Sequence, residues 1–188
     1  MKKKLLQFTF CSLFLVLFSC SEDSPLFPEF TAVYFPTAVG NKWVYNNGTL
    51  DWTIEIEATK IIDKKSYYIF VRNYDGVRDT NFYRVAENNL VLVWFDDKDY
   101  TYINFDAPIN QQWQFHSGFY GFVRERNLTD TVTAGSFTDV TEILIANHII
   151  SDVFEYNRYA PGVGLISTAG WRRYSELKNA TVNGITYP

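Results

Sequence analysis

The sequence has few of the residues that build metal centres, disulfide frameworks and nucleophilic active sites. Its 188 residues include two cysteines, Cys11 and Cys20, and two histidines, His116 and His148. Neither histidine has another histidine or a cysteine at zinc-site spacing, and serine-elbow, HExxH and phosphate-loop motifs are missing. A serine hydrolase would need one of the histidines beside a serine that only the fold can supply. The sequence therefore predicts no catalytic residue, no cofactor and no metal.

The chain also lacks a surplus of positive charge and a long apolar run. It has 17 basic and 21 acidic residues, and three of the basic ones are the lysines at positions 2–4. Beyond Ser19, 14 basic residues therefore stand against 21 acidic ones, a formal charge of −7. Such a chain offers no basic face for phosphates, so we expect no nucleic-acid partner. The apolar run Leu5–Phe18 is interrupted by polar residues and is short for a bilayer of about 30 Å.

The start of the chain has the pattern of a secretory signal, with lysines, a short apolar segment and a small residue. Leu17-Phe18-Ser19-Cys20 resembles the signal of a bacterial lipoprotein, in which a diacylglyceryl group is attached to the cysteine before cleavage. The resemblance implies a signal peptide at residues 1–19 and lipid attachment at Cys20. Two or three acyl chains would make the membrane attachment lasting. The alternative is an ordinary secretory signal in which Cys20 occurs by chance.

Residues 20–30 carry this cysteine and have the polar, acidic and proline-rich composition of a flexible tether. The acidic pair Glu22-Asp23 resembles the export tag of Bacteroidota lipoproteins on the outer face of the outer membrane. It implies an outer-membrane location and favours the cell surface over the periplasmic face, although a charged tether is also an ordinary solvated linker. With Cys11 in the signal and Cys20 lipidated, the remaining chain has no thiol for a disulfide.

From residue 31 to residue 188 the sequence predicts one all-β domain. The clearest strand is Leu50–Lys60, where polar and apolar residues alternate strictly. Its buried face is expected to carry Leu50, Trp52, Ile54, Ile56 and Ala58. Further β-rich segments, Phe119–Arg126 and Thr129–Ala134 among them, are separated by turn residues, and only in Val140–Ile149 does a helix compete with a strand. We expect a strongly curved antiparallel sheet or a β-barrel of about ten strands.

Three motifs follow one another along the chain. They are Tyr34-Phe35-Pro36 with Gly40-Asn41-Lys42-Trp43-Val44-Tyr45, then Thr131-Val132-Thr133-Ala134-Gly135-Ser136-Phe137, and Tyr159-Ala160-Pro161-Gly162-Val163-Gly164-Leu165-Ile166. In this order they resemble elements of a broad group of uncharacterised Bacteroidota outer-membrane lipoproteins. At the level of fold, this group looks distantly similar to the curved half-barrels of lipoprotein-trafficking carriers. The resemblance brings no catalytic residues with it.

The same motifs have a structural interpretation, which we prefer. Their glycines suit turns with positive φ or close backbone contacts, and their aromatic residues suit a core. The expected turn glycines are Gly40, Gly135, Gly162 and Gly164. The expected core aromatics are Trp43, Tyr45, Phe137 and Tyr159.

Two groups of carboxylates are candidates for chemistry. Asp96, Asp97 and Asp99 could bind Ca²⁺ through oxygen, but their loop does not match an EF-hand, and an acidic hairpin tip is the preferred alternative. Glu55 and Glu57, about 7 Å apart along a strand, could form a glycosidase acid pair, although on an exposed strand such residues serve solubility. Eight arginines in the strand regions are expected to pair with acids across strands, or else to stack on aromatic rings.

These observations leave two main function classes open. The preferred one is non-catalytic binding of a small apolar or glycan-type ligand, cupped by a curled, aromatic-rich sheet. The alternative is a structural or interaction module tethered to an envelope protein complex, which would use an exposed apolar patch or a free sheet edge. A hydrolase is the third and least favoured class. Large side chains throughout the interior would favour the interaction module, whereas small or polar ones around a hollow would favour ligand binding.

Overall fold

The strands form one antiparallel sheet that curls into a nearly closed barrel. The computed structural model describes residues 33–116, 118–150, 153–170 and 173–188, and these contain 13 strands and no helix. No described segment is therefore a helix of the length and apolarity needed to cross a membrane. The all-β prediction is confirmed, with 13 strands in place of about ten. The strands are β1 (Lys42–Asn46), β2 (Asp51–Ile62), β3 (Lys65–Tyr74), β4 (Val77–Ala86), β5 (Leu90–Phe95), β6 (Lys98–Asn104), β7 (Trp113–Gln114), β8 (Phe119–Val132), β9 (Gly135–Asn147), β10 (Phe154–Ala160), β11 (Gly164–Gly170), β12 (Arg173–Val182) and β13 (Ile185–Tyr187).

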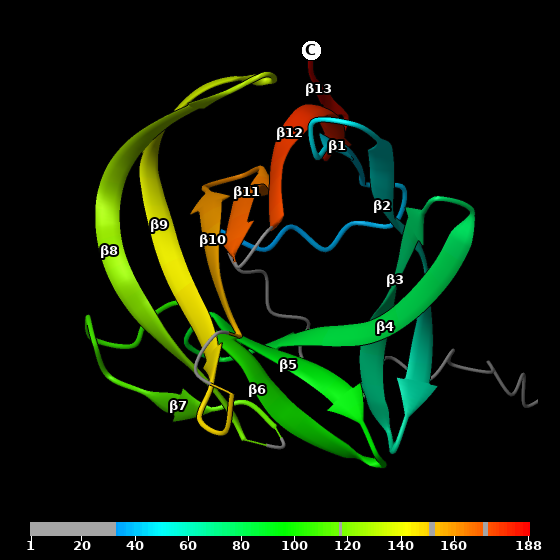
Figure 1. Ribbon diagram of the computed structural model, residues 1–188. Coiled ribbons are helices and arrows are strands. Elements are labelled where there is room, and N and C mark those ends of the chain that lie inside the picture. Colours follow the sequence, from blue (N-terminus) through cyan, green and yellow to red (C-terminus); the bar gives the residue numbers. More distant parts are fainter. Residues whose placement is uncertain (1–32, 117, 151–152, 171–172) are drawn as a thin grey trace, which may run out of the picture.

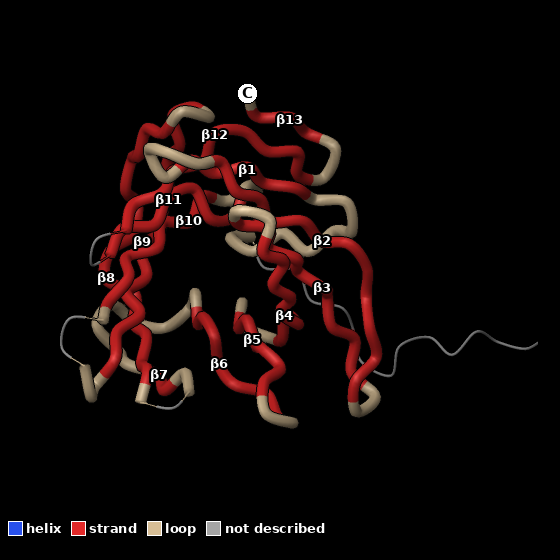
Figure 2. The backbone as a smooth tube through the Cα atoms, turned by 45° about the vertical axis from the view of Figure 1, so that its right-hand side comes forward, coloured by secondary structure: helices blue, strands red, loops and turns tan. Residues whose placement is uncertain are grey.

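Two meanders of strands meet along β1 and β12. The order across the sheet is β6-β5-β4-β3-β2-β1-β12-β11-β10-β9-β8-β7, with β13 paired to β12. Most neighbours in space are also neighbours in sequence, so hairpins make most of the connections. The sheet curls until its two ends, β6 and β7, approach each other (Figure 1). Figure 2 shows the same curled sheet from a second direction.

The seam between β6 and the β7–β8 pair is closed by side chains. Trp113 Nε1 donates to the Tyr102 carbonyl at 3.2 Å, and Arg126 donates to the Phe105 carbonyl. The Trp113 ring packs on Gly121, where an added Cβ would lie 2.6 Å from the indole. Residues that bond carbonyls across the seam thus replace part of the backbone ladder that a fully closed barrel would have.

Several two-residue hairpin turns share one backbone geometry. Both central residues have positive φ in Asp63-Lys64, Asp96-Asp97 and Asn183-Gly184. This type I′ geometry matches the twist of the flanking strands. The four expected turn glycines, Gly40, Gly135, Gly162 and Gly164, also have positive φ, as predicted.

The inner face of the barrel carries most of the large apolar side chains. Trp43, Tyr45 and Tyr159 are buried, and Phe137 is half-buried against the same core. The four expected core aromatics are therefore confirmed. Because aromatic residues bury large areas, they fill much of the barrel interior.

The alternation expected for β2 breaks at Glu57. Trp52 and Ile56 are buried and Ile54 is half-buried, as predicted. A β-bulge between Ile56 and Ala58 makes Glu57 an extra residue opposite β3, and Ala58 is exposed. The expected burial of Ala58 is wrong, because a one-residue insertion moves the following side chains to the other face.

β8 and β9 form a longer hairpin than the sequence predicts. The two segments expected at Phe119–Arg126 and Thr129–Ala134 belong largely to the single strand β8. Register shifts interrupt its pairing with β9, and Asn127 has positive φ, so the chain bends without ending the strand. The ambiguous stretch Val140–Ile149 lies largely in β9 and contains no helix.

Residues 33–40 cross the barrel before β1 begins (Figure 1). The Val33 carbonyl accepts a hydrogen bond from Gly162 N at 2.7 Å, and Gly40 N donates to the Ile56 carbonyl at 2.8 Å. Between these contacts, Phe35 is buried with its ring centroid 5.2 Å from that of Phe70. The segment therefore forms an internal wall of the barrel.

The end of the β8–β9 hairpin, here called the arm (residues 126–140), bends over β11 and β12 (Figure 1). At its tip, Ala134 N donates to the Leu177 carbonyl of β12 at 3.0 Å. Thr133 Oγ1 donates to Glu176 at 2.5 Å beside this contact. The arm is thus fixed to a strand far from it in sheet order.

Candidate functional site

An aromatic pocket lies inside the barrel. Its volume is about 70 Å³, which suits a few water molecules or one small ring and is well below the several hundred Å³ of pockets that enclose drug-sized ligands. Seven of its eleven lining residues are aromatic and none is charged. The lining residues are Phe35, Pro36, Trp43, Tyr45, Ile54, Phe70, Tyr83, Tyr102, Tyr159, Gly164 and Leu165.

Hydrogen bonds fix the rings of one wall. Trp43 Nε1 donates to the Val163 carbonyl at 2.7 Å, and the Tyr45 hydroxyl donates to the Leu165 carbonyl at 2.9 Å. Both acceptors lie on the β10–β11 turn or at the start of β11. The Trp43 ring is also nearly parallel to that of Phe70, with an angle of 11° between the planes. This wall is therefore rigid before any ligand arrives.

Three tyrosines, Tyr83, Tyr102 and Tyr159, bring hydroxyl groups into this aromatic site. Burial raises the pKa of each hydroxyl well above its usual value, so all three stay protonated at physiological pH. The rings of Tyr83 and Tyr102 are 5.1 Å apart between centroids, and Tyr102 also interacts with Tyr159. The three hydroxyls form a polar strip in an otherwise apolar pocket.

Charged side chains flank the tyrosines but do not line the pocket. Arg72 Nη2 and Asp79 Oδ2 form an ion pair at 2.9 Å, close enough to Tyr83 for both charges to act on its hydroxyl. Glu155 acts in the same way on the other two tyrosines, and its side chain is exposed. The tyrosine strip therefore lies between a neutralised ion pair and a solvated carboxylate.

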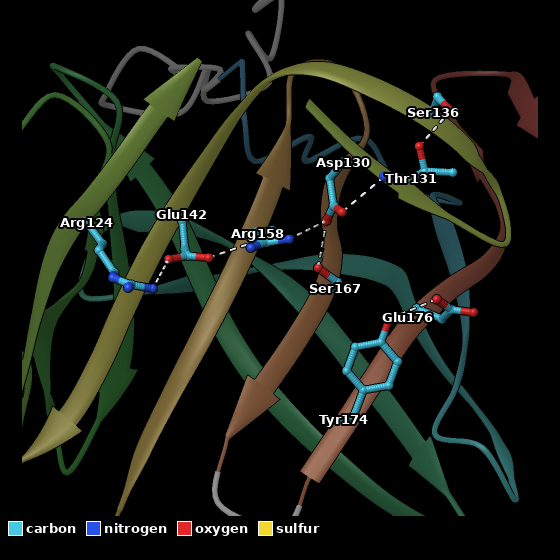
Figure 3. Close-up of polar contacts among 9 residues, drawn as sticks. All are labelled: Arg124, Asp130, Thr131, Ser136, Glu142, Arg158, Ser167, Tyr174 and Glu176. Atoms are coloured by element: carbon cyan, nitrogen blue, oxygen red, sulfur yellow. Dashed lines mark hydrogen bonds and ion pairs between the residues drawn. The ribbon is translucent and has the colours of Figure 1, made fainter. Parts of the chain in front are cut away.

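A second candidate, the polar cluster, lies on a row of cross-strand partners beside the arm (Figure 3). Glu142, Arg158, Ser167 and Glu176 are successive partners across β9, β10, β11 and β12. The Glu142 side chain is only 3% exposed. Its carboxylate accepts hydrogen bonds from Arg124 Nη1 at 2.7 Å and from Arg158 Nε at 2.8 Å. Two cations thus compensate one buried carboxylate.

The polar cluster holds the arm to the sheet. Asp130 of the arm lies 3.2 Å from Arg158 Nη1 and accepts a hydrogen bond from Ser167 Oγ, also at 3.2 Å. A serine nucleophile needs a general base that takes its proton, and an arginine-paired aspartate is a weak one. We therefore assign the polar cluster a structural role.

Neither histidine has a serine partner in the described part of the chain. The ring centroid of His116 lies 4.4 Å from that of Phe95 and 5.2 Å from that of Tyr100. His148 stacks on Tyr120 at 4.0 Å. In the described part of the chain, the serine hydroxyls that form side-chain hydrogen bonds do so with Trp52, Asp130 and Thr131. The described residues thus assemble no serine–histidine pair.

The aspartates of the β5–β6 turn do not converge on one point. Asp96 and Asp97 are exposed at the two positive-φ positions of the turn. Burial tends to raise the pKa of Asp99, but three hydrogen-bond donors hold it below its usual value. These donors are Arg84 at 2.6 Å, Tyr67 at 2.6 Å and Lys65 at 2.9 Å. No group of three metal-ligating side chains occurs among the residues that the structure describes.

Glu55 and Glu57 are each engaged by a different cation. Glu55 forms an ion pair with Lys42 of β1 at 3.0 Å, and Glu57 forms one with Arg78 of β4. The two carboxylates are thus drawn toward opposite sides of β2. This arrangement does not suit a glycosidase acid pair that acts on one substrate. Pairing of strand arginines with acids, expected from the sequence, is confirmed at five positions: Arg72, Arg78, Arg84, Arg124 and Arg158.

The first and third sequence motifs meet beside the pocket. Besides the bonds of Trp43 and Tyr45 to the third motif, Gly164 approaches Pro36 so closely that an added Cβ would lie 3.3 Å from its ring. The second motif forms the tip of the arm on β12. Turn geometry and packing therefore account for all three motifs.

No signal in the sequence marks Tyr83 and Tyr102 as pocket residues. They lie on β4 and β6, and period-two alternation shows that a strand has two faces without showing which one is concave. Cys20 and the acidic pair Glu22-Asp23 lie outside the described residues.

Comparison with known proteins shows similarity at the level of solved structures. No protein-family model matches the chain, and no curated protein sequence matches it. A Bacteroides fragilis protein described as exported, with a YmcC-like fold, has 15% identity and a TM-score of 0.46, covering 79% of this chain and 99% of its own. A protein from Parabacteroides distasonis described as a lipoprotein has 12% identity and a TM-score of 0.44, covering 81% of this chain and 100% of its own.

Proposed function

We propose that this chain is an outer-membrane lipoprotein that binds a small ligand without catalysing a reaction. The observation that carries the proposal is the aromatic pocket, with its hydrogen-bonded wall and its strip of tyrosine hydroxyls. A concave, mostly apolar site with a few convergent polar groups is the usual form of a small-molecule site. The pocket volume of about 70 Å³ limits the enclosed part of the ligand to about one ring.

In this proposal Cys20 supplies the membrane anchor. The Cys20→Ala variant should leave the membrane fraction of lysed cells, because the acyl chains that hold it there are lost. Cys11→Ala, a matched change inside the signal segment, should leave the protein in the membrane fraction. Membrane retention of Cys20→Ala would contradict lipid anchoring.

The acidic pair Glu22-Asp23 supports an outward-facing position for the anchored protein. Protease added to intact cells should then degrade the wild-type protein. Replacing both acids with alanine should protect it, while a periplasmic control protein stays intact in both strains. Protection of the wild-type protein in intact cells would place it on the periplasmic face instead.

Ligand binding is tested by native mass spectrometry on protein purified from its own host. We expect an additional mass of small-molecule size on the wild-type chain. Ile54→Trp fills the pocket and should remove this mass, whereas Ile69→Trp, outside the pocket lining, should keep it. A bare protein mass for the wild type would contradict ligand binding.

A second candidate, an interaction module, is favoured by a patch of exposed apolar side chains. Phe95 is 52% exposed and contacts His116, while Ile149 is 81% exposed. An added Cβ on Gly118 would lie 3.1 Å from Ile149 Cδ1, and Phe119 N donates to the His116 carbonyl at 2.8 Å. Contiguous exposed apolar groups often mark a protein-binding surface. The occupant in this case would be an envelope protein.

A photo-crosslinking amino acid at position 149 tests this second candidate. One discrete crosslinked product should form in intact cells, and Phe95→Glu should abolish it. The same amino acid at position 77, where Val77 is also exposed, should give no such product. Equal products from both positions would exclude a specific partner at this patch.

A further inference from the structure

We infer that the ligand of the aromatic pocket is an uncharged ring with several hydroxyl groups, the chemistry of a single hexose unit. This inference rests on the proposed ligand-binding function and specifies the class of the ligand. It depends on the charge of the pocket lining, the protonation of its hydroxyls, the unpartnered polar atoms next to Tyr159 and the aromatic rings of the lining.

The lining favours an uncharged ligand. No charged side chain is among the eleven lining residues. The nearby cation, Arg72, is already paired with Asp79 at 2.9 Å. A charged ligand in this pocket would lose water without gaining an opposite charge, and such burial is strongly unfavourable.

The tyrosine strip favours a ligand with hydroxyl groups. Tyr83, Tyr102 and Tyr159 stay protonated, so each can both donate and accept a hydrogen bond. Hydrogen bonds between Tyr102 and each of the other two hydroxyls use only part of this capacity. A hydrocarbon ligand would leave the remaining donor and acceptor sites without partners. Buried polar groups that lose their partners discriminate strongly against such a ligand.

Two polar side chains beside Tyr159 have hydrogen-bonding capacity that the described residues do not use. Asn157 is on the same face of β10 as Tyr159, and Thr141 is the cross-strand partner of Tyr159 on β9. Both side chains are buried, and Asn157 Nδ2 and Thr141 Oγ1 have no hydrogen-bond partner. Neither residue lines the pocket, so these atoms provide polar capacity behind Tyr159 that an ordered water can fill.

The aromatic lining suits the less polar face of a sugar, because seven of the eleven lining residues carry rings. Trp43 and Phe70 are nearly parallel, and Tyr102 lies 5.1 Å from Tyr83 between centroids. The electron-rich face of an aromatic ring attracts the slightly positive C–H groups of a pyranose. The hydroxyls at the edge of the same sugar would then reach the tyrosine strip.

The test uses saturation-transfer NMR and titration with the full chain carrying Cys20→Ala. The probes are the methyl glycosides of glucose, galactose, mannose and rhamnose, with toluene as an uncharged ring without hydroxyls and tetramethylammonium as a cation. At least one glycoside should bind. Tyr102→Phe and Tyr83→Phe should each weaken it by about tenfold, the value of one good hydrogen bond. Tyr174→Phe, on the outer surface, should leave the affinity unchanged.

The outcomes separate the ligand class from ligand binding itself. Thermal melting first establishes that each tyrosine variant is folded. Binding of toluene or tetramethylammonium, without binding of any glycoside, would overturn the inferred class and keep the ligand-binding function. Unchanged glycoside affinity in both folded tyrosine variants would also overturn it. Failure of every probe, together with a bare native mass, would reject the ligand-binding function.

Discussion

The Asp99 carboxylate connects neighbouring strands through the hydrogen bonds that it accepts. It accepts hydrogen bonds from Lys65 and Tyr67 of β3 and from Arg84 of β4. Arg84 also lies over the Tyr67 ring, 5.9 Å from its centroid. The group is 15% exposed, so these bonds are only partly screened by water.

The lowered pKa of Asp99 predicts a stability change at acid pH. A carboxyl with a lower pKa in the folded state stabilises the fold above its unfolded pKa of about 3.9, and this contribution is lost as pH falls through the folded value. At pH 7, Asp99→Asn should lower the free energy of unfolding by about 1–2 kcal/mol. The difference from wild type should shrink as pH falls below about 4.

Urea unfolding between pH 7 and pH 3 measures this difference. Asp97→Asn, in the exposed turn nearby, serves as the matched control and should change stability little at any pH. A gap between wild type and Asp99→Asn that stays constant over the whole range would contradict the assigned role of Asp99.

At the scale of elements, the attachment of the arm to the sheet depends on the buried carboxylate of Glu142. Glu142→Gln removes the charge that compensates Arg124 and Arg158. We expect a loss of about 2 kcal/mol in the free energy of unfolding, because a neutral amide at this buried position replaces two charge-assisted hydrogen bonds. Glu57→Gln removes a more exposed ion pair and should cost less than about 0.5 kcal/mol.

The arm should also loosen before the rest of the sheet in Glu142→Gln. Hydrogen exchange of the Ala134 amide, which bonds to the Leu177 carbonyl, reports this directly. Faster exchange at Ala134 with unchanged exchange in β3 is the expected pattern. Equal acceleration in both places would mean that the variant destabilises the whole sheet instead.

The alternation of polar and apolar residues predicts which side chains of a strand are buried, but only as far as the next β-bulge. Trp52 and Ile56 were assigned correctly to the buried face, whereas Ala58, just past the bulge, was not. The continuation of β8 through Asn127 escaped prediction for a similar reason. A bulge depends on how two segments of the chain pair with each other, so the sequence of a single strand does not predict it.

At the scale of the whole molecule, barrel closure depends on a tight contact at the seam. Gly121→Ala places a methyl group against the Trp113 ring and should displace the indole from the Tyr102 carbonyl. We expect a loss of about 1–3 kcal/mol in the free energy of unfolding, the usual effect of overpacking.

A double-mutant cycle tests whether Trp113 is the cause. In a Trp113→Ala background, the same Gly121→Ala change should cost almost nothing, because the clashing ring is gone. Denaturant unfolding of the four proteins gives the coupling energy. Equal costs in both backgrounds would assign the effect of Gly121→Ala to the backbone of β8.

The pocket is a property of the whole barrel, and the sequence could not supply it. Trp43, Tyr45 and Tyr159 were predicted as core residues from their motifs, and they are. Tyr83 and Tyr102 join them only because the two meanders curl toward each other. The sequence predicts the residues of each strand face but not the curvature that brings the faces together.

The crossing segment at residues 33–40 determines where mechanical load enters the molecule. Any pull on the chain upstream of Val33 acts first on its bond to Gly162 and then on Phe35, packed against Phe70 in the barrel centre. Tension therefore reaches the interior before it reaches either sheet edge. For a protein held by its N-terminus at a moving surface, the pocket wall would be the first part to bear the strain.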